Sequence, residues 1–546
     1  MSSVSAATEA TDAIDTSGPT APPGPPPDAS LRAGRRLSLA HQLARQARRT
    51  PTAPALRHRD REITYAALDA RVNRLARAYA ARGVGPGDRV AALTTNRMET
   101  VEVWFAALRL GAIAVPINFR LVPAEVAHVL GDCTPTVFVV DEPLTELGLE
   151  ARRLAGSGCR VLHLGEDASS APEGTENLTT VRDAYDEGPV EADVDENAPA
   201  FLMYTSGTTG RSKGAVLSHL NLVVNTLHMA EVQAPRPTDR GLLNIPMFHI
   251  AGVDSVVASM LYGTCTVIGA TVGFDASETV DLLERERITG CFLVPSQWKA
   301  ICEVPGIRDR KLVLNSLSWG ASVAPPSVLE AMNDTFPGVV IRSAFGQTEM
   351  ASVTCYLDGE DAVRKLGSVG KPVRHVDARI VDEEMRDVPV GEVGEIVYRG
   401  GNLMLGYWNN PEATAEAFEG GWFHSGDLCR MDDEGYIYVV DRKKDMIISG
   451  GENIYSAEVE AVIDQHPKVA EVAVVGVPHP EWVETPRAYV VPKDPADPPT
   501  EADITGHCRE RLASYKKPTS VVVIEALPRN AAGKVLKVRL RESARD

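Results

Sequence analysis

Short apolar segments alternate with amphipathic helical patterns through most of this chain, and this alternation constrains its fold more than any other feature. Residues 65–82 have the periodicity of an amphipathic helix, and residues 89–93 follow as an apolar strand. A second helical pattern over 98–110 is followed by a strand pattern over 112–116. Repeated alternation of this kind predicts an α/β fold whose sheets are mostly parallel.

The pattern changes in the last third of the chain. Alternation continues to about residue 385, after which residues 391–399 and 435–440 have the composition of hairpin strands. The fully charged run 441–445 follows, and such a run is by default a solvated turn. The remaining residues predict a smaller α+β module, with strands expected over 472–475, 488–491 and 521–524.

Composition argues against several classes of protein. The net charge of −18 argues against a nucleic-acid partner. No segment reaches the ~20 apolar residues that a membrane-spanning helix needs, so no transmembrane segment is expected. The eight cysteines lack CxxC or zinc-ligand spacing, which is typical of reduced thiols and predicts a cytoplasmic location. Residues 1–36 are rich in Ala, Ser, Thr and Pro and predict a disordered tail.

The most informative motif is the string YTSGTTGRSKG over residues 204–214, which an apolar strand pattern over 201–204 precedes. Its five Ser/Thr hydroxyls, three glycines and one lysine predict a cradle for a polyphosphate. Glycines let backbone N–H groups approach phosphate oxygens, hydroxyls donate further hydrogen bonds, and the lysine supplies positive charge. The motif is not a Walker A loop, because Gly207 and Lys213 do not have that spacing.

This motif resembles the phosphate-binding signature of the adenylate-forming superfamily, which includes acyl-CoA synthetases, firefly luciferase and the adenylation domains of peptide synthetases. The resemblance covers nearly all of the chain after the tail. It implies a large N-terminal adenylation domain over 37–441, built from αβ-sandwich sheets and a small β barrel. It also implies a hinge over 442–445, with Lys444 as the pivot, and a small mobile α+β C-terminal domain over 446–546.

The resemblance assigns the binding of the nucleotide and of Mg²⁺ to several short motifs. The phosphate-binding residues would be Thr205, Ser206, Gly207, Thr208, Thr209, Lys213 and Thr348. The adenine would lie against Gly320, Ala321, Ser322, Phe345 and Gly346, and the ribose hydroxyls would bind Asp427 and Arg442. The Mg²⁺ ligands would be Glu349 and Thr205, because this cation prefers oxygen.

Three further motifs are implied to serve catalysis and CoA binding. Lys534, in PRNAAGK, would be the lysine of the adenylation step, which only domain closure could bring to the α-phosphate. His249, in PMFHIAG, would be the aromatic gate between the channels for the acid and the thiol. Gly450 and Gly451, in SGGENI, would line the pantetheine tunnel after domain rotation, because consecutive glycines permit close backbone approach.

The predicted activity is that of an ATP-dependent acyl-CoA synthetase. A small-molecule carboxylic acid and MgATP would give acyl-AMP and pyrophosphate, and the thiol of CoA would then displace AMP. The acid pocket is expected from residues 249–255, 297–300 and 319–322, whose side chains are small or apolar apart from His249, Asp254, Gln297 and Lys299. This composition favours a medium- or long-chain fatty acid, with an aryl or cinnamate-type acid as a close second.

Several alternatives stay open at this point. The chain could load a carrier protein instead of CoA, or bind a nucleotide without catalysis, and a homodimer is neither indicated nor excluded. Trp319 stands where the family has a small residue, so it would either narrow the acyl pocket or fill the core.

Overall fold

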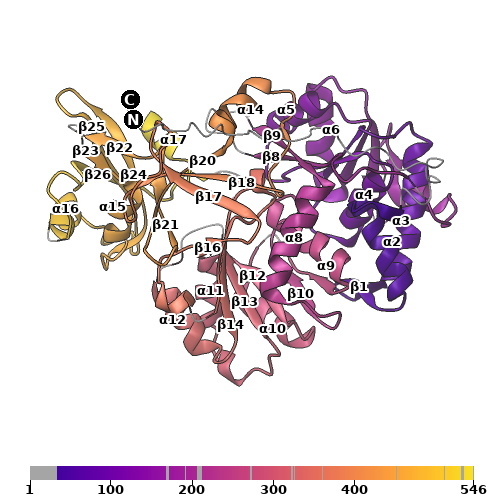
Figure 1. Cartoon of the computed structure of the whole chain (residues 1–546), viewed down its shortest axis with the longest axis horizontal. Helices are drawn as coiled ribbons and strands as arrows, with labels where there is room; N and C mark the ends of the chain where they lie inside the picture. Colours follow the sequence, from indigo (N-terminus) through magenta and orange to yellow (C-terminus); the bar gives the residue numbers. More distant parts are fainter. Residues whose placement is uncertain are drawn as a thin grey trace, which may run out of the picture.

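Two large sheets, a four-stranded sheet and a C-terminal sheet form the protein, as its computed structural model shows (Figure 1). The structure describes residues 34–165, 167, 171–190, 192–205, 212–270, 273–320, 324, 326–359, 361–449, 452–509, 511–529 and 534–544. The fold is mixed α/β with a smaller C-terminal α/β unit, which confirms the predicted fold class.

One large sheet has eight strands in the order β19-β9-β8-β4-β3-β5-β6-β7. In chain order they are β3 (Arg89–Leu93), β4 (Ile113–Pro116), β5 (Val137–Asp141), β6 (Arg160–Leu164), β7 (Glu176–Asn177), β8 (Pro199–Thr205), β9 (Lys213–Ser218) and β19 (Gly406–Tyr407). Strands β3 to β8 pair in parallel, whereas β8 and β9 form an antiparallel hairpin. The phosphate-loop motif therefore joins two adjacent strands of this sheet.

The other large sheet has nine strands in the order β16-β15-β14-β13-β12-β10-β11-β1-β2. They are β1 (Pro54–His58), β2 (Arg61–Thr64), β10 (Arg240–Leu243), β11 (Cys265–Ile268), β12 (Gly290–Leu293), β13 (Ser316–Gly320), β14 (Val340–Phe345), β15 (Cys355–Leu357) and β16 (Lys371–Pro372). The strands from β1 to β14 in this order run parallel, so their carboxyl ends share one edge. Gly320 and Phe345 end β13 and β14 at that edge, where ligands commonly bind in parallel sheets.

Helices join the two large sheets through a shared core. These helices are α2 (Leu39–Arg49), α3 (Tyr65–Ala80), α4 (Met98–Arg109), α8 (His219–Gln233) and α9 (Ile250–Tyr262). Helix α8 contacts β8 and β9, and helix α9 contacts β10 and β11. One buried apolar cluster contains Phe201 of β8, Val256 of α9 and Ile268 of β11, so the two sheets share a continuous core.

The other helices cover the outer surfaces of the sheets. They are α5 (Pro123–Cys133), α6 (Thr145–Leu154), α7 (Leu178–Asp183), α10 (Ala276–Arg285), α11 (Pro295–Cys302), α12 (Pro326–Thr335), α13 (Asp361–Arg364) and α14 (Pro411–Ala417). None of the helices in the described ranges combines the length and the apolar character needed to cross a bilayer.

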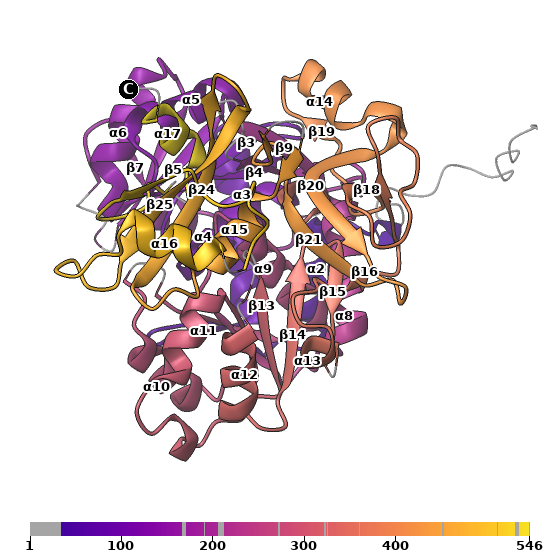
Figure 2. The same cartoon turned by 90° about the vertical axis from the view of Figure 1, so that its left-hand side faces the viewer.

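Two smaller sheets follow. The first has the order β17-β18-β20-β21, from β17 (Val376–Val381), β18 (Gly394–Gly400), β20 (Phe423–Met431) and β21 (Ile437–Arg442), and it stands where the small β barrel is expected. The C-terminal sheet contains β22 (Ile447–Ser449), β23 (Glu452–Ile454), β24 (Val469–His479), β25 (Val483–Pro492) and β26 (Ser520–Val523), with α15 (Ser456–Ile463), α16 (Glu501–Arg509) and α17 (Lys537–Glu542). It has its own apolar core; Figure 1 shows it at one side of the molecule, and Figure 2 shows it in gold and yellow, in front of the rest.

The charged run 441–445 is more ordered than its composition predicts. Strand β21 extends through Asp441 and Arg442, which pair with Leu428 and Asp427 of β20. The carboxylate of Asp441 also accepts hydrogen bonds from the backbone N–H of Ser456 (2.5 Å) and from its hydroxyl (2.9 Å), at the start of α15. Strand pairing thus orders the first part of a run that charge alone would assign to a solvated turn.

Ordered contacts begin before residue 37. The guanidinium of Arg36 forms an ion pair with Asp193 (Nε to Oδ1, 3.0 Å), whereas residues 1–33 of the expected tail lie outside the described residues. All eight cysteines are free thiols, and all except the half-buried Cys302 are buried.

Candidate active site

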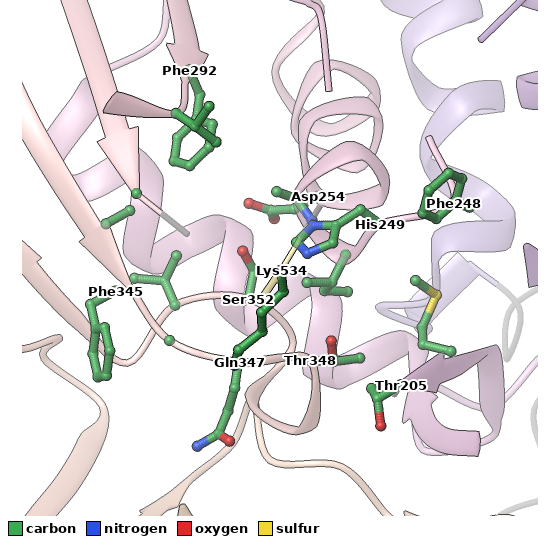
Figure 3. A pocket seen from close by; sticks show the side chains of 18 of the residues that line it. Thr205, Phe248, His249, Asp254, Phe292, Phe345, Gln347, Thr348, Ser352 and Lys534 are labelled. Carbon is green, nitrogen blue, oxygen red and sulfur yellow. The ribbon is translucent and has the colours of Figure 1, made fainter. Parts of the chain in front are cut away.

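A cavity of about 2810 Å³ brings together residues from both large sheets, the four-stranded sheet and the C-terminal segment (Figure 3). Its lining contains every predicted site residue that the structure describes: Thr205, Lys213, His249, Gly320, Phe345, Gly346, Thr348, Glu349, Asp427, Arg442, Lys444 and Lys534. The other predicted residues, Ser206, Gly207, Thr208, Thr209, Ala321, Ser322, Gly450 and Gly451, lie outside the described residues.

The ends of the β8–β9 hairpin form one wall of the cavity. Thr205 and Lys213 are partners in the strand register, and the Thr205 hydroxyl donates a long hydrogen bond to the Lys213 carbonyl (3.4 Å). The Lys213 ammonium lies 5.2 Å from the centre of the Tyr407 ring, which favours a cation there. The hairpin therefore presents a hydroxyl and a positive charge to the same space.

Glu349 is held by a residue that sequence reasoning missed. The Tyr407 hydroxyl donates a hydrogen bond to Glu349 Oε1 (2.9 Å), and burial together with the Glu349 charge raises the pKa of Tyr407. Tyr407 therefore stays protonated and can keep donating. Gly346 permits the tight turn before Glu349, because an added Cβ would overlap the carbonyl oxygen of Ser352. The sequence holds no signal for this pair, since strand β19 joins the sheet only in the tertiary fold.

Asp427 and Arg442 form an ion pair between adjacent strands. They are register partners on β20 and β21, and Arg442 Nε lies 2.5 Å from Asp427 Oδ1. Burial raises the pKa of Asp427, and the positive charges of Arg442 and Lys534 act in the opposite direction. A buried carboxylate with one oxygen paired to a guanidinium can still accept hydrogen bonds from two adjacent hydroxyls, as a ribose site requires.

Lys534 lies in the same cavity as these residues, although it belongs to the C-terminal segment (Figure 3). Burial and the positive charges of Arg442 and Lys444 lower the pKa of Lys534 to about 8, while the carboxylates of Asp427 and Asp445 oppose this shift. Negative charge entering the cavity would favour the protonated lysine. The site is thus poised to bind an anion at Lys534.

The charged run beside Lys534 is fixed on both sides by side-chain contacts. Lys443 Nζ lies 3.1 Å from Glu395 Oε2 on β18, and Arg541 of α17 forms an ion pair with Asp445 (2.9 Å). Lys444 lines the cavity, and burial lowers its pKa. This short run therefore connects the four-stranded sheet to the C-terminal unit.

His249 precedes helix α9 at the other end of the cavity. The backbone N–H of Ala251 donates to His249 Nδ1 (3.2 Å), so the neutral ring carries its proton on Nε2. Burial lowers the pKa of His249, which favours this neutral form. His249 can consequently offer one N–H donor to an oxygen in the cavity.

The predicted acid pocket needs one correction. Residues 297–300 do not line the cavity, and Val294 and Ser296 do. Trp298 is fully buried in a second core cluster, separate from the one that joins the two large sheets. Its Nε1–H donates a hydrogen bond to the Ser318 carbonyl (3.0 Å), and the next residue, Lys299, is turned outward to solvent. Lys299 is therefore not a partner for a second carboxylate of the substrate.

Trp319 and Asp254 do belong to the cavity wall. Trp319 packs in the second core cluster, as one of its two alternatives has it, and it also lines the cavity. That it narrows the acyl pocket stays a prediction. Asp254 reaches the cavity from α9, and Figure 3 shows its carboxylate beside His249. A carboxylate among small and aromatic side chains is unusual enough to require an explanation.

The residues present fit MgATP but not a metal site made by protein alone. The described residues contain no cluster of three or more His, Cys, Asp or Glu side chains that could hold a metal ion. Mg²⁺ is commonly bound by one or two carboxylates together with phosphate oxygens of a substrate. Glu349 and the Thr205 hydroxyl, which line the same cavity as Lys213, match this arrangement.

Comparison with known proteins agrees with this geometry. The family model for AMP-binding enzymes matches residues 43–408, and the model for the AMP-binding enzyme C-terminal domain matches residues 458–534. The feruloyl-CoA synthase of Amycolatopsis sp is 40% identical over 498 residues, covering 91% of this chain and 97% of that protein. A long-chain-fatty-acid–CoA ligase of Mycobacterium tuberculosis is 37% identical over 486 residues, covering 88% of this chain and 93% of that protein.

A solved structure is similar over nearly the whole fold. The O-succinylbenzoate coenzyme A synthetase from Bacillus subtilis, in complex with ATP and magnesium ion, has a TM-score of 0.80 at 31% identity, covering 93% of this chain and 99% of that one. The chain therefore belongs to the AMP-binding enzyme family of the adenylate-forming superfamily, and it is an acid–thiol ligase that uses MgATP and CoA.

Proposed function

We propose that this ligase activates a compact aromatic carboxylic acid, rather than the medium- or long-chain fatty acid that the sequence favours. The main observation that supports this proposal is that the Asp254 carboxylate lies in the wall of the cavity near His249. A hydrocarbon chain lying against this group would remove water from it and offer no hydrogen bond in return, which is costly. Trp319 and Phe292, also in the wall, supply flat apolar surfaces that suit an aromatic ring.

The first half-reaction follows from the charges around the cavity. An oxygen of the substrate carboxylate attacks the α-phosphorus of ATP, the bond from that phosphorus to the β-bridging oxygen breaks, and pyrophosphate leaves with the electron pair. Lys213 and Lys534, which both line the cavity, would stabilise negative charge on the phosphates. Mg²⁺, held by Glu349 and Thr205, would neutralise further phosphate charge. Asp427 and Arg442 would hold the ribose, and Gly320, Phe345 and Gly346 would hold the adenine.

The second half-reaction transfers the acyl group to CoA. The thiol sulfur attacks the acyl carbonyl of the acyl-adenylate, the bond from that carbon to the phosphate oxygen breaks, and AMP leaves as the thiol proton passes to solvent. His249 would donate from Nε2 to the acyl oxygen. The observed arrangement, with Lys534 in the cavity, fits the first half-reaction, so the C-terminal unit would rotate about Lys444 before the second. Gly450 and Gly451 would then approach the pantetheine arm.

The test is AMP release from ATP across a panel of acids, each with and without CoA. The panel runs from acetate to palmitate and includes benzoate, phenylacetate, cinnamate and ring-substituted cinnamates. Higher kcat/KM for an aromatic acid, dependent on CoA, is expected. Preference for palmitate or decanoate over every aromatic acid would overturn the proposed acid class, and turnover that ignores CoA would point to a carrier protein as acceptor.

A further inference from the structure

Asn225 of helix α8 holds the Asp254 carboxylate in a fixed orientation. The Asn225 side chain is fully buried, and its Oδ1 accepts a hydrogen bond from the backbone N–H of Val353 (3.0 Å). Its Nδ2 donates to Asp254 Oδ1 (2.7 Å). Because an amide has one acceptor end and one donor end, the Val353 contact decides that Asn225 presents its donor to Asp254. The carboxylate is thus supported from α8 while it projects from α9.

Asp254 lines the cavity, and the described residues give a hydrogen bond to only one of its two carboxylate oxygens. Within the part of the chain that the structure describes, no group donates to Oδ2, and no cationic side chain forms an ion pair with Asp254. Burial raises the pKa of Asp254 to about 7, while the Asn225 hydrogen bond acts in the opposite direction. Half-burying a carboxylate with one supported oxygen is costly unless another group donates to it.

The position of Asp254 suits the far end of a ring-bearing acid. Asp254 lies four positions after Ile250 in helix α9, which corresponds to about 6 Å of helix rise. His249 lies at the start of this helix, beside the region that the substrate carboxylate would occupy. Figure 3 shows Phe292 and Ser352 on neighbouring walls, so a ring between these walls could reach Asp254 with a substituent.

We propose that Asp254, oriented by Asn225, accepts a hydrogen bond from a donor substituent on the acid, so that this ligase selects hydroxylated or aminated aromatic acids. This inference rests on the proposed aromatic substrate, and it adds which kind of substituent the aromatic ring carries. An ether or an unsubstituted ring would leave Oδ2 unpaired. A site built around a polar partner rejects an analogue that lacks that partner more strongly than an apolar pocket rejects a small change in size.

The wild-type enzyme gives the first test. We would measure kcat/KM for cinnamate, 4-hydroxycinnamate, 4-aminocinnamate and 4-methoxycinnamate, of which the last is an acceptor only. At least about tenfold preference for the hydroxy or amino acid over the methoxy acid is expected, because only the first two can donate a hydrogen bond to the carboxylate. Comparison of 4-hydroxycinnamate with 4-aminocinnamate shows whether a hydroxyl or an amino group is the preferred donor. Equal kcat/KM for the four acids would overturn the inference while leaving the aromatic class intact.

Asp254→Asn gives the second test. Asn225 would still donate to the new Oδ1, so the new amide would present its Nδ2–H₂ donor where Oδ2 accepted before. The preference for 4-hydroxycinnamate over 4-methoxycinnamate should then fall by about tenfold or invert. A preference unchanged in this variant would overturn the role of Asp254.

Lys299→Gln is the matched control, because Lys299 is another polar side chain predicted for the pocket and instead faces solvent. It should leave the ranking of the four acids unchanged. Thermal unfolding of each variant with and without ATP separates loss of folding from loss of selectivity. A wild-type enzyme that accepts fatty acids but no cinnamate would refute the proposed function itself, an outcome distinct from those above.

Discussion

Lys443 and Glu395 connect the hinge run to the nucleotide site. Lys443 Nζ lies 3.1 Å from Glu395 Oε2, and Glu395 Oε1 accepts a hydrogen bond from the backbone N–H of Gly426 (3.0 Å), the residue before Asp427. One carboxylate on β18 thus contacts both the run 441–445 and the segment that holds Asp427. The side chain of Lys443 is half exposed, so the ion pair itself is worth less than about 1 kcal/mol.

Lys443→Gln should slow acyl-AMP formation by roughly two- to fivefold, because it weakens a contact present in the arrangement that places Lys534 in the cavity. Thioester formation from preformed acyl-AMP should not slow. Rapid-quench measurement of the two half-reactions checks this. Lys468→Gln, which removes an exposed ion pair with Asp497 inside the C-terminal unit, is the control. Equal slowing of both half-reactions would contradict the linkage.

Lys534→Ala should reduce acyl-AMP formation by at least about a hundredfold, because it removes the positive charge that would face the phosphates in the proposed mechanism. Thioester formation from preformed acyl-AMP should be nearly unchanged, since the C-terminal unit would present another surface in that step. Single-turnover assays of each half-reaction measure the split. Lys517→Ala, a change of a half-buried lysine of the same unit that does not line the cavity, should affect neither. Full adenylation by Lys534→Ala would refute the assignment.

The rate of adenylation should decline as the pH rises. The decline should begin at a lower pH than it would if Lys534 had the ordinary pKa of a lysine. The pKa of Lys534 is lowered to about 8, chiefly by burial and then by Arg442 and Lys444, so the free enzyme loses this charge as pH rises through that value. The kcat/KM for ATP, which reports the free enzyme, should therefore decline above about pH 8. In Lys534→Arg this decline should disappear, because a guanidinium stays charged. A wild-type profile that is flat to pH 9.5 would contradict the prediction.

Tyr407→Phe should raise the Mg²⁺ concentration needed for half-maximal adenylation by about three- to tenfold. The substitution removes the hydrogen bond that orients Glu349, but it leaves an aromatic ring beside Lys213. The loss of one hydrogen bond corresponds to about 1 kcal/mol of binding free energy. If Tyr407 had a purely structural role, its substitution would lower activity equally at every Mg²⁺ concentration. If Tyr407 instead positions Glu349, excess Mg²⁺ should restore the activity of the variant. Tyr438→Phe, whose hydroxyl bonds to Asp432 outside the cavity, is the control.

Sequence patterns predicted the parts of the site that depend on local order. Thr205 and Lys213 lie at the ends of one hairpin, and Gly320 and Phe345 end parallel strands, so short-range patterns were enough to locate them. Lys534 lies in the cavity as its motif implied, although the roles of all these residues stay predictions.

Other features depend on how distant elements pack, and these were missed. Tyr407 reaches Glu349 only because β19 joins the edge of the eight-stranded sheet. Asn225 reaches Asp254 only because α8 packs on α9. The prediction for residues 297–300 was wrong because the burial of Trp298 sets the rotation of α11, and a helical pattern does not reveal which polar side chain then faces the cavity.

The anchoring of the charged run has a consequence for the rate of the catalytic cycle. Arg442 is fixed by Asp427 and by strand pairing, and Asp445 is fixed by Arg541, so only Lys443 and Lys444 lie between two held positions. Three backbone steps span at most about 11 Å, so the C-terminal unit cannot move far from the cavity while it turns. In the proposed cycle, Lys534 would therefore return to the phosphates at a high effective concentration after each thioester is released, without a search through solution.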